Sequence, residues 1–231
     1  MQTLDIVARI RTDFPEKFGI PRQSGLIDAL KGRIVFAEKY RDASALRGIE
    51  GYSHLWLIWQ FSESVTERFS PTVKPPRLGG NTRVGVFATR SPFRPNPLGL
   101  SCVKLERVEL STPEGPVLHV AGADLMDGTP IYDIKPYLPY ADCHPDAVGG
   151  FAEDIDDRRL RVRFPEPLLA LIPEEKRPAL IEVLAQDPRP GYRREDDRRR
   201  YGVCFAGFDV RFVVEEGALS VVEVEAVSKN G

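Results

Sequence analysis

The sequence predicts a mainly β protein, with a small β-barrel over residues 1–150 followed by a small α+β domain over residues 151–231. Short apolar or alternating segments follow one another through loops rich in proline and glycine, and the clearest helical pattern comes late, at residues 173–186. A doubly wound nucleotide-binding sheet needs a glycine-rich turn between a strand and a helix, and no such unit precedes residue 173. Strands joined to one another by loops alone favour a barrel.

The strands expected in the barrel are short and mostly apolar or alternating. They are residues 4–10, 33–36, 54–61, 84–88, 100–110, 117–121 and 131–134. Before the third of them, residues 40–49 show helical spacing at Tyr40, Ala43 and Leu46, and we expect a helix that ends at Gly48. His54 begins the aromatic-rich third strand, where a buried, hydrogen-bonded histidine is expected rather than a catalytic one.

The C-terminal domain is expected to combine one helix with a small sheet. Pro173 opens the helix, and Glu174 and Glu175 occupy its first turn, where carboxylates favour the helix dipole. The apolar side chains on one helix face are Leu180, Ile181 and Leu184. The strands expected around this helix are residues 160–164, 208–214 and 219–224, the last two joined as a hairpin.

A proline-rich loop between two expected strands organises the chain. Pro92, Pro95 and Pro97 fall within six residues, so neither a helix interior nor a central strand can pass through them. Arg90 and Arg94 lie at this rigid loop, without a carboxylate nearby in sequence. Such a loop suits a contact with an anion or a planar ligand, because little entropy is lost in holding it. The alternative is a structural loop with solvated arginines.

Composition restricts the function classes. A net charge of −2 over 231 residues argues against nucleic-acid binding through overall charge, so local basic patches would be needed. Three widely separated cysteines form neither a disulfide framework nor a paired zinc motif, and Cys143 beside His144 is too sparse for a metal site. No signal peptide or membrane-spanning run is evident, so we expect a soluble, cytoplasmic protein without a bound metal.

Three long motifs occur in order along the chain. They are FGIPRQSGL at residues 18–26, RSPFRPNPLGLS at residues 90–101 and DLMDGTPIYDIKPYLPY at residues 124–140. Together they resemble the signatures of the TrmO family of TsaA-like tRNA methyltransferases. The segment DPRPGYR at residues 187–193 resembles the small C-terminal domain of that family. The resemblance implies a β-barrel that binds S-adenosylmethionine and methylates the N6 nitrogen of N6-threonylcarbamoyladenosine (t6A) at tRNA position 37.

The resemblance also implies site residues. The implied cofactor contacts are Pro21, Arg22, Gln23, Ser62, Glu63, Arg90, Leu100, Asp127, Gly128, Thr129 and Pro130. Family members often carry a histidine where this chain has Ser62, which puts a role for that side chain in doubt. Asp133 and Tyr137 are alternative candidates for the catalytic base or proton relay. Arg22, Arg90 and Arg94 could each serve the cofactor carboxylate, the threonyl carboxylate or an RNA phosphate.

The third motif has a second interpretation that needs no ligand. Asp124, Asp127, Asp133 and Lys135 lie close together in it, as turn-capping aspartates and a surface ion pair or as the wall of a ligand site.

The tRNA anticodon loop is expected to contact the basic segment 189–200, which lies between Tyr192 and Tyr201 in a mixture typical of single-stranded RNA binders. A solvated loop is the alternative, and residues 74–83 are the second candidate footprint. The RNA-binding residues expected are Arg94, Tyr192, Arg193, Arg194, Arg198 and Arg199. The resemblance implies a homodimer. Two other functions stay open: a non-catalytic RNA- or nucleotide-binding barrel that keeps the pocket, and a methyltransferase acting on another nucleotide or metabolite.

Overall fold

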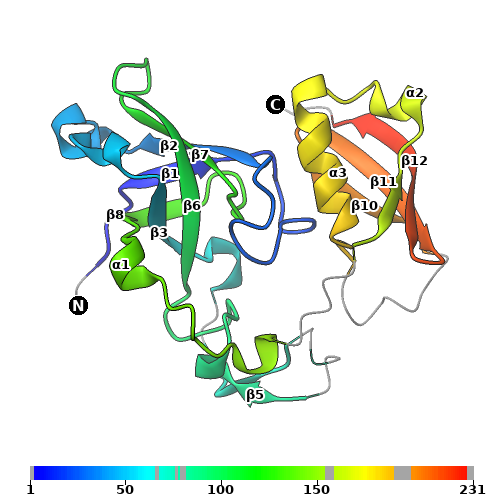
Figure 1. The fold of residues 1–231 in the computed structure, drawn as a ribbon, viewed down its shortest axis with the longest axis horizontal. Helices are drawn as coiled ribbons and strands as arrows, with labels where there is room; N and C mark the ends of the chain where they lie inside the picture. Colours follow the sequence, from blue (N-terminus) through cyan, green and yellow to red (C-terminus); the bar gives the residue numbers. More distant parts are fainter. Residues whose placement is uncertain are drawn as a thin grey trace.

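A closed barrel of six antiparallel strands forms the N-terminal half of the protein (Figure 1). The computed structural model describes residues 3–65, 68–75, 78, 82–153, 159–189 and 199–227. The barrel order is β1–β2–β7–β6–β3–β8, and β8 closes the ring by pairing with β1. The strands are β1 (Ala8–Arg11), β2 (Lys31–Phe36), β3 (His54–Gln60), β6 (Leu98–Glu109), β7 (Val117–Ala121) and β8 (Pro130–Pro136).

The alternation of side chains along β3 explains how the barrel core forms. Leu55, Leu57 and Trp59 point into the barrel and are almost fully buried, whereas Trp56 and Ile58 lie on the outer face. The inward residues join a core that the other barrel strands complete. Burying apolar area at about 25 cal/mol per Å² supplies the main driving force for closing the ring.

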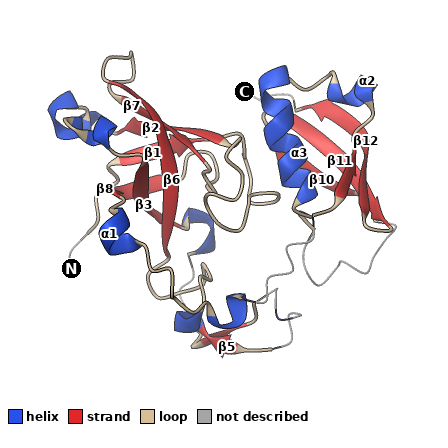
Figure 2. Cartoon of the chain, viewed as in Figure 1, coloured by secondary structure: helices blue, strands red, loops and turns tan. Residues whose placement is uncertain are grey.

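A second, four-stranded sheet forms the C-terminal unit, and helix α3 (Arg177–Ala185) packs against it (Figure 2). Its order is β10–β11–β12–β9, with β9 parallel to β12 and the other pairs antiparallel. The strands are β9 (Arg161–Arg163), β10 (Tyr201–Phe205), β11 (Phe208–Glu215) and β12 (Ala218–Ala226). The remaining elements are the short helices α1 (Pro139–Asp142) and α2 (Glu166–Leu169) and the β4 (Thr72–Val73) and β5 (Val84–Gly85) pair.

The segment between β1 and β2 joins the barrel to the C-terminal unit. Phe14 packs edge-on against Phe205 of β10, with ring centroids 5.2 Å apart, and Ile27 and Leu30 lie in the same core. Gly19 has φ +89°, and a side chain there would meet Val203 at 2.3 Å, so only glycine lets the segment approach β10 this closely. Part of the first sequence motif therefore docks on the C-terminal sheet.

The structure confirms the predicted mainly β fold, with a barrel followed by a unit of sheet and helices. The predicted helix at residues 40–49 is wrong: three 3₁₀ turns occupy this region, Glu38–Tyr40, Ala43–Leu46 and Ile49–Gly51, because the segment breaks at Asp42 and again at Gly48. The expected strand at residues 84–88 is β5 followed by the 3₁₀ turn Val86–Ala88. Strand β10 was not expected. The division at residue 150 stays a prediction, and segment 14–30 contributes to the core of the C-terminal unit.

Candidate functional site

The proline-rich loop is held in place by its own side chains. The Nη1 atom of Arg94 donates to the carbonyl of Thr89 at 2.9 Å, so this guanidinium folds back onto the loop. The backbone amide of Phe61, after β3, donates to the carbonyl of Pro97 at 2.8 Å. The loop is thereby tied to the end of β3, and its three prolines leave little backbone freedom.

Arg90 and Gln23 bring the first two sequence motifs together. Nη1 of Arg90 donates to Oε1 of Gln23, and Arg90 is exposed. The segment that carries Gln23 is fixed next to it, because the amide of Cys102 donates to Oγ of Ser24 at 3.0 Å and the amide of Gly25 donates to the carbonyl of Gly122 at 2.9 Å. Within the part of the chain that the structure describes, no carboxylate lies within ion-pair distance of Arg90. This guanidinium can therefore meet an anion.

Asp124 joins the third motif to the same place. Its Oδ1 atom accepts a hydrogen bond from Oγ of Ser101 at 2.6 Å, and that oxygen accepts one from the indole Nε1 of Trp59 at 2.9 Å. Burial raises the pKa of the Asp124 carboxyl, while the Ser101 hydroxyl, backbone amides and the charge of Arg90 oppose this. Asp124 was singled out in the sequence only as one of several motif aspartates. Its hydrogen-bonding partners come from β6 and from the segment before β2, so no local pattern revealed its position.

The predicted turn at residues 127–130 is pinned to β1. Oδ1 of Asp127 accepts from the amide of Thr12 at 3.0 Å, and Oδ2 lies 3.4 Å from Nη1 of Arg11. Nη1 of Arg9 donates to the carbonyl of Gly128 at 2.7 Å. Thr129 is buried, and its Oγ1 donates to the carbonyl of Met126, so this side chain is used to shape the turn. The turn therefore presents mainly backbone atoms.

Ser62 and Glu63 lie in a 3₁₀ turn directly after β3, and both side chains are exposed. Nζ of Lys17 donates to the carbonyl of Glu63 at 2.6 Å and to Oγ of Ser64 at 3.0 Å. These contacts hold the turn against the segment that leads to Pro21 and Arg22. Pro21 is buried and Arg22 is exposed.

The two candidate bases lie on the outer face of the barrel and are separated. Across the sheet, Ile58 pairs with Leu100 on one side and with Asp133 on the other, so Asp133 shares a face with the predicted cofactor contact Leu100. Nζ of Lys135 lies 2.9 Å from Oδ2 of Asp133. Tyr137 lies four residues further along, roughly 13 Å away at about 3.3 Å per residue. One ligand atom cannot contact both side chains.

Tyr137 belongs to a different cluster on this face. Its ring lies 5.8 Å from that of Trp56 and 6.2 Å from that of His54, which is half-buried and bonded to Ser53 as expected. Burial and nearby thiols and carboxylates raise the pKa of Tyr137. The phenol therefore stays protonated at neutral pH.

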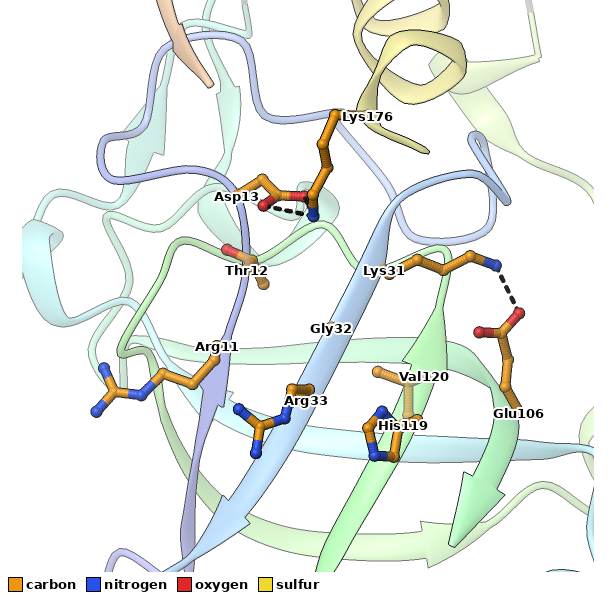
Figure 3. Close-up of a pocket in the computed structure, with 10 residues that line it drawn as sticks. All are labelled: Arg11, Thr12, Asp13, Lys31, Gly32, Arg33, Glu106, His119, Val120 and Lys176. Carbon is orange, nitrogen blue, oxygen red and sulfur yellow. Dashed lines mark hydrogen bonds and ion pairs between the residues drawn. The ribbon is translucent and has the colours of Figure 1, made fainter. Parts of the chain in front are cut away.

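A hollow of about 380 Å³ lies over β1, β2 and β7 (Figure 3). Its lysines are engaged: Lys31 pairs with Glu106 at 2.5 Å and Lys176 pairs with Asp13 at 2.6 Å. Arg11, at one side of the hollow, pairs with Asp127 of the predicted turn. The hollow thus borders the turn but lies away from Arg90 and Asp124. We place the candidate site where the three sequence motifs meet, because the motif side chains converge there.

The expected RNA-binding residues fall into three groups. Tyr192, Arg193, Arg194 and Arg198 lie outside the described residues. Arg94 binds its own loop, and Arg199 is exposed with its guanidinium 5.7 Å from the ring centre of Tyr201. Tyr201 was expected to stack on bases, which is wrong: it is buried, with its ring stacked on that of Phe212. Arg189 is also buried, in an ion pair with Asp187, so it does not extend the basic segment.

Two searches of the described residues returned nothing. They contain no group of three or more histidine, cysteine, aspartate or glutamate residues arranged to hold a metal ion. Among them there is also no helix with the length and apolarity needed to cross a membrane.

Comparison with known proteins gives the same two-part division. The model of the tRNA-methyltransferase O N-terminal domain matches residues 9–143, and that of the TrmO C-terminal domain matches residues 157–227. The chain belongs to the TrmO family. The resemblance of the three motifs is thereby confirmed.

Individual TrmO relatives extend the match over nearly the whole chain. An Escherichia coli protein named tRNA (adenine(37)-N6)-methyltransferase is 44% identical over 225 residues, which cover 94% of each chain. A Pseudomonas aeruginosa protein, whose name places it among the S-adenosylmethionine-dependent methyltransferases, is 42% identical over 89% of this chain and 90% of its own. The crystal structure of TrmO from Pseudomonas aeruginosa superposes with a TM-score of 0.78 at 33% identity, covering 98% of this chain and 99% of that one.

Proposed function

We propose that this TrmO family protein transfers a methyl group from S-adenosylmethionine to the N6 nitrogen of adenosine 37 in tRNA, and that the base it modifies is t6A. The printed names of the relatives support the reaction and the cofactor. The observation that carries the proposal is the convergence of three motifs on Arg90, Gln23 and Asp124.

The residues at this place fit the cofactor. S-adenosylmethionine combines an apolar-faced adenine with a carboxylate, and the site offers both kinds of partner. Arg90 can bind the carboxylate, as a guanidinium does well. Phe93 and Leu100 are 52% and 54% exposed next to it, and large apolar side chains left in solvent beside a cation are typical of a ligand surface. The backbone of the 127–130 turn and Gln23 can bind polar edges of the nucleoside.

When bound, the cofactor supplies an activated methyl group on a sulfonium, which is a good leaving group. The protein has to bind and orient the reactants and exclude water. Orientation alone can lower a barrier by about 7–11 kcal/mol in favourable cases. The proline-rich loop suits this task, because a backbone that is already rigid loses little freedom on binding.

The acceptor nitrogen of t6A is urea-like, so its lone pair is delocalised and removal of its proton should assist attack. Of the two candidates, we propose Asp133 as the residue that takes this proton. It shares a face with Leu100, and an ionised carboxylate is present at neutral pH. Tyr137 is less suited, because its raised pKa keeps the phenol protonated.

The deciding experiment is nucleoside analysis of tRNA after incubation with the protein and S-adenosylmethionine. We expect a mass increase of one methyl group on t6A from tRNA that carries this base. Parallel reactions contain tRNA that lacks the threonylcarbamoyl group. Methylation of both tRNAs would contradict the t6A specificity but keep the adenosine-37 activity. Calorimetric cofactor binding without any methylated nucleoside would favour the alternative, a non-catalytic barrel that keeps its pocket.

Three further parts of the proposal concern partners and place. We propose that the basic segment 189–200 and Arg94 contact the anticodon loop, that the protein works in the cytoplasm, and that it forms a homodimer. Sedimentation at micromolar concentration tests the last point, since a single species at the monomer mass of 25.9 kDa would contradict it.

A further inference from the structure

A buried carboxylate lies where all three sequence motifs meet. Asp124 belongs to the third motif, and it bonds to Ser101, the last residue of the second. The backbone of Ser24, in the first motif, also hydrogen-bonds to this carboxylate. Burying a charge is costly unless hydrogen bonds and an opposite charge compensate it. A carboxylate in this position therefore needs a reason beyond packing.

The hydrogen bonds around Asp124 run in one direction. The indole of Trp59 has only a donor, so the oxygen of Ser101 must accept from it. The single proton of Ser101 then points to Oδ1 of Asp124, 2.6 Å away. Trp59 and Ser101 are both almost fully buried and hold the carboxylate rigidly against β6. A chain of this kind fixes the carboxylate in place and favours its charged form.

The charge of Asp124 acts on Arg90. Arg90 is the positive group named as lowering the carboxyl pKa, and the attraction between the two charges is mutual. Arg90 in turn donates to Gln23, whose neighbour Ser24 is bonded to both Cys102 and Asp124. The exposed guanidinium is thus held between a fixed carboxylate and a fixed amide.

We propose that Asp124 is a positioning residue for cofactor binding, whose negative charge, fixed by Ser101, orients Arg90 toward the cofactor. This inference rests on the proposed function and deepens it. Asp124 contacts neither reactant in this account, because it is buried behind Arg90, and it acts on binding rather than on the methyl transfer itself.

The test is calorimetric binding of S-adenosylmethionine and of S-adenosylhomocysteine to the full chain carrying Asp124→Asn. The amide is the same size as the carboxylate and can still accept from Ser101. We expect both dissociation constants to rise about 10- to 100-fold, as for the loss of a charge-assisted interaction. The melting temperature of the ligand-free protein should not fall, because the substitution removes a buried charge.

A double-mutant cycle with Arg90→Ala separates positioning from a merely structural role. If Asp124 acts through Arg90, Asp124→Asn should change the dissociation constant by less than about threefold when Arg90 is already absent. Asp142→Asn is the matched control. Asp142 also accepts from a tryptophan indole, that of Trp56 at 3.0 Å, but it lies beside α1 on the outer face, and its variant should bind the cofactor normally.

Ser101→Ala provides a second variant that keeps the carboxylate and removes its anchor, and it should weaken binding in the same direction. Unchanged binding in Asp124→Asn, or fully additive effects in the cycle, would overturn the proposal. So would a melting temperature that falls in step with affinity. If the unaltered protein binds neither ligand, the proposed function itself fails, which is a distinguishable result.

Discussion

Replacing Arg189 with alanine should destabilise the C-terminal unit strongly. Nε of Arg189 lies 2.8 Å from Oδ1 of Asp187, and Nη2 lies 3.1 Å from Oδ2, so the pair is bidentate. The side chains are only 5% and 7% exposed. Removing the cation leaves a buried carboxylate without its charge partner, which typically costs about 3–5 kcal/mol. For a chain of this size, each kcal/mol shifts the melting temperature by about 2–4 °C, so a fall of about 6–20 °C is expected.

Thermal unfolding followed by circular dichroism measures this effect, with Arg33→Ala as the matched control. Arg33 also pairs with a carboxylate, that of Glu114 at 2.7 Å, but both side chains are about half exposed, at 45% and 46%. Exposed pairs contribute about 0–1 kcal/mol, so the control should lose no more than about 4 °C. If Arg189→Ala melts no lower than Arg33→Ala, the argument from burial is wrong.

Three further substitutions test other parts of the structure. Gly99→Ala should destabilise the barrel by about 1–3 kcal/mol and weaken cofactor binding, because the new methyl group would meet the Trp59 ring at 2.3 Å and displace the donor to Ser101. Asp142→Asn should lower stability at pH 7 but not at pH values well below 3.8. The amide of Leu138 and the indole of Trp56 lower the pKa of Asp142, so its contribution is present above the unfolded pKa and lost as pH falls through the folded one. A quadruple alanine variant of the basic segment should weaken tRNA binding and reduce its salt slope by about 0.7–0.9 per lost phosphate contact, without changing cofactor affinity; its positions are Arg193, Arg194, Arg198 and Arg199.

Each of these has a contrary outcome. Wild-type melting and binding in Gly99→Ala would show that the indole has room to move. A pH-independent loss in Asp142→Asn would mean that the carboxylate charge is not what stabilises the fold. An unchanged salt slope in the quadruple variant would place the RNA footprint elsewhere, with residues 74–83 as the next segment to test.

The sequence by itself determined the fold class and the motifs. Strand β7 was expected at residues 117–121 and is observed there, and the expected helix at residues 173–186 contains α3. These features are local, because strand alternation, proline placement and helix faces are set by neighbouring residues. The three motifs were likewise legible as continuous segments, and they were sufficient to indicate the family.

Failures at the sequence level occurred where tertiary packing overrides local pattern. The spacing of Tyr40, Ala43 and Leu46 suggested a helix, but the segment forms separate 3₁₀ turns. Tyr201 looked like a stacking residue beside a basic run, yet it begins a strand and faces the core. Neither outcome depends on neighbouring residues alone, because the docking of other segments decides which side chains are buried.

Only the tertiary structure decided how the motifs form one site. Ser24 and Cys102 are 78 residues apart, and their bond places the first motif against β6. Strand register then puts Ser101 inside the barrel, where it meets Asp124, and leaves Leu100 outside beside Asp133. A shift of one residue in this pairing would exchange the two faces. The site thus depends on the register of distant strands, which the amino-acid pattern of each segment does not contain.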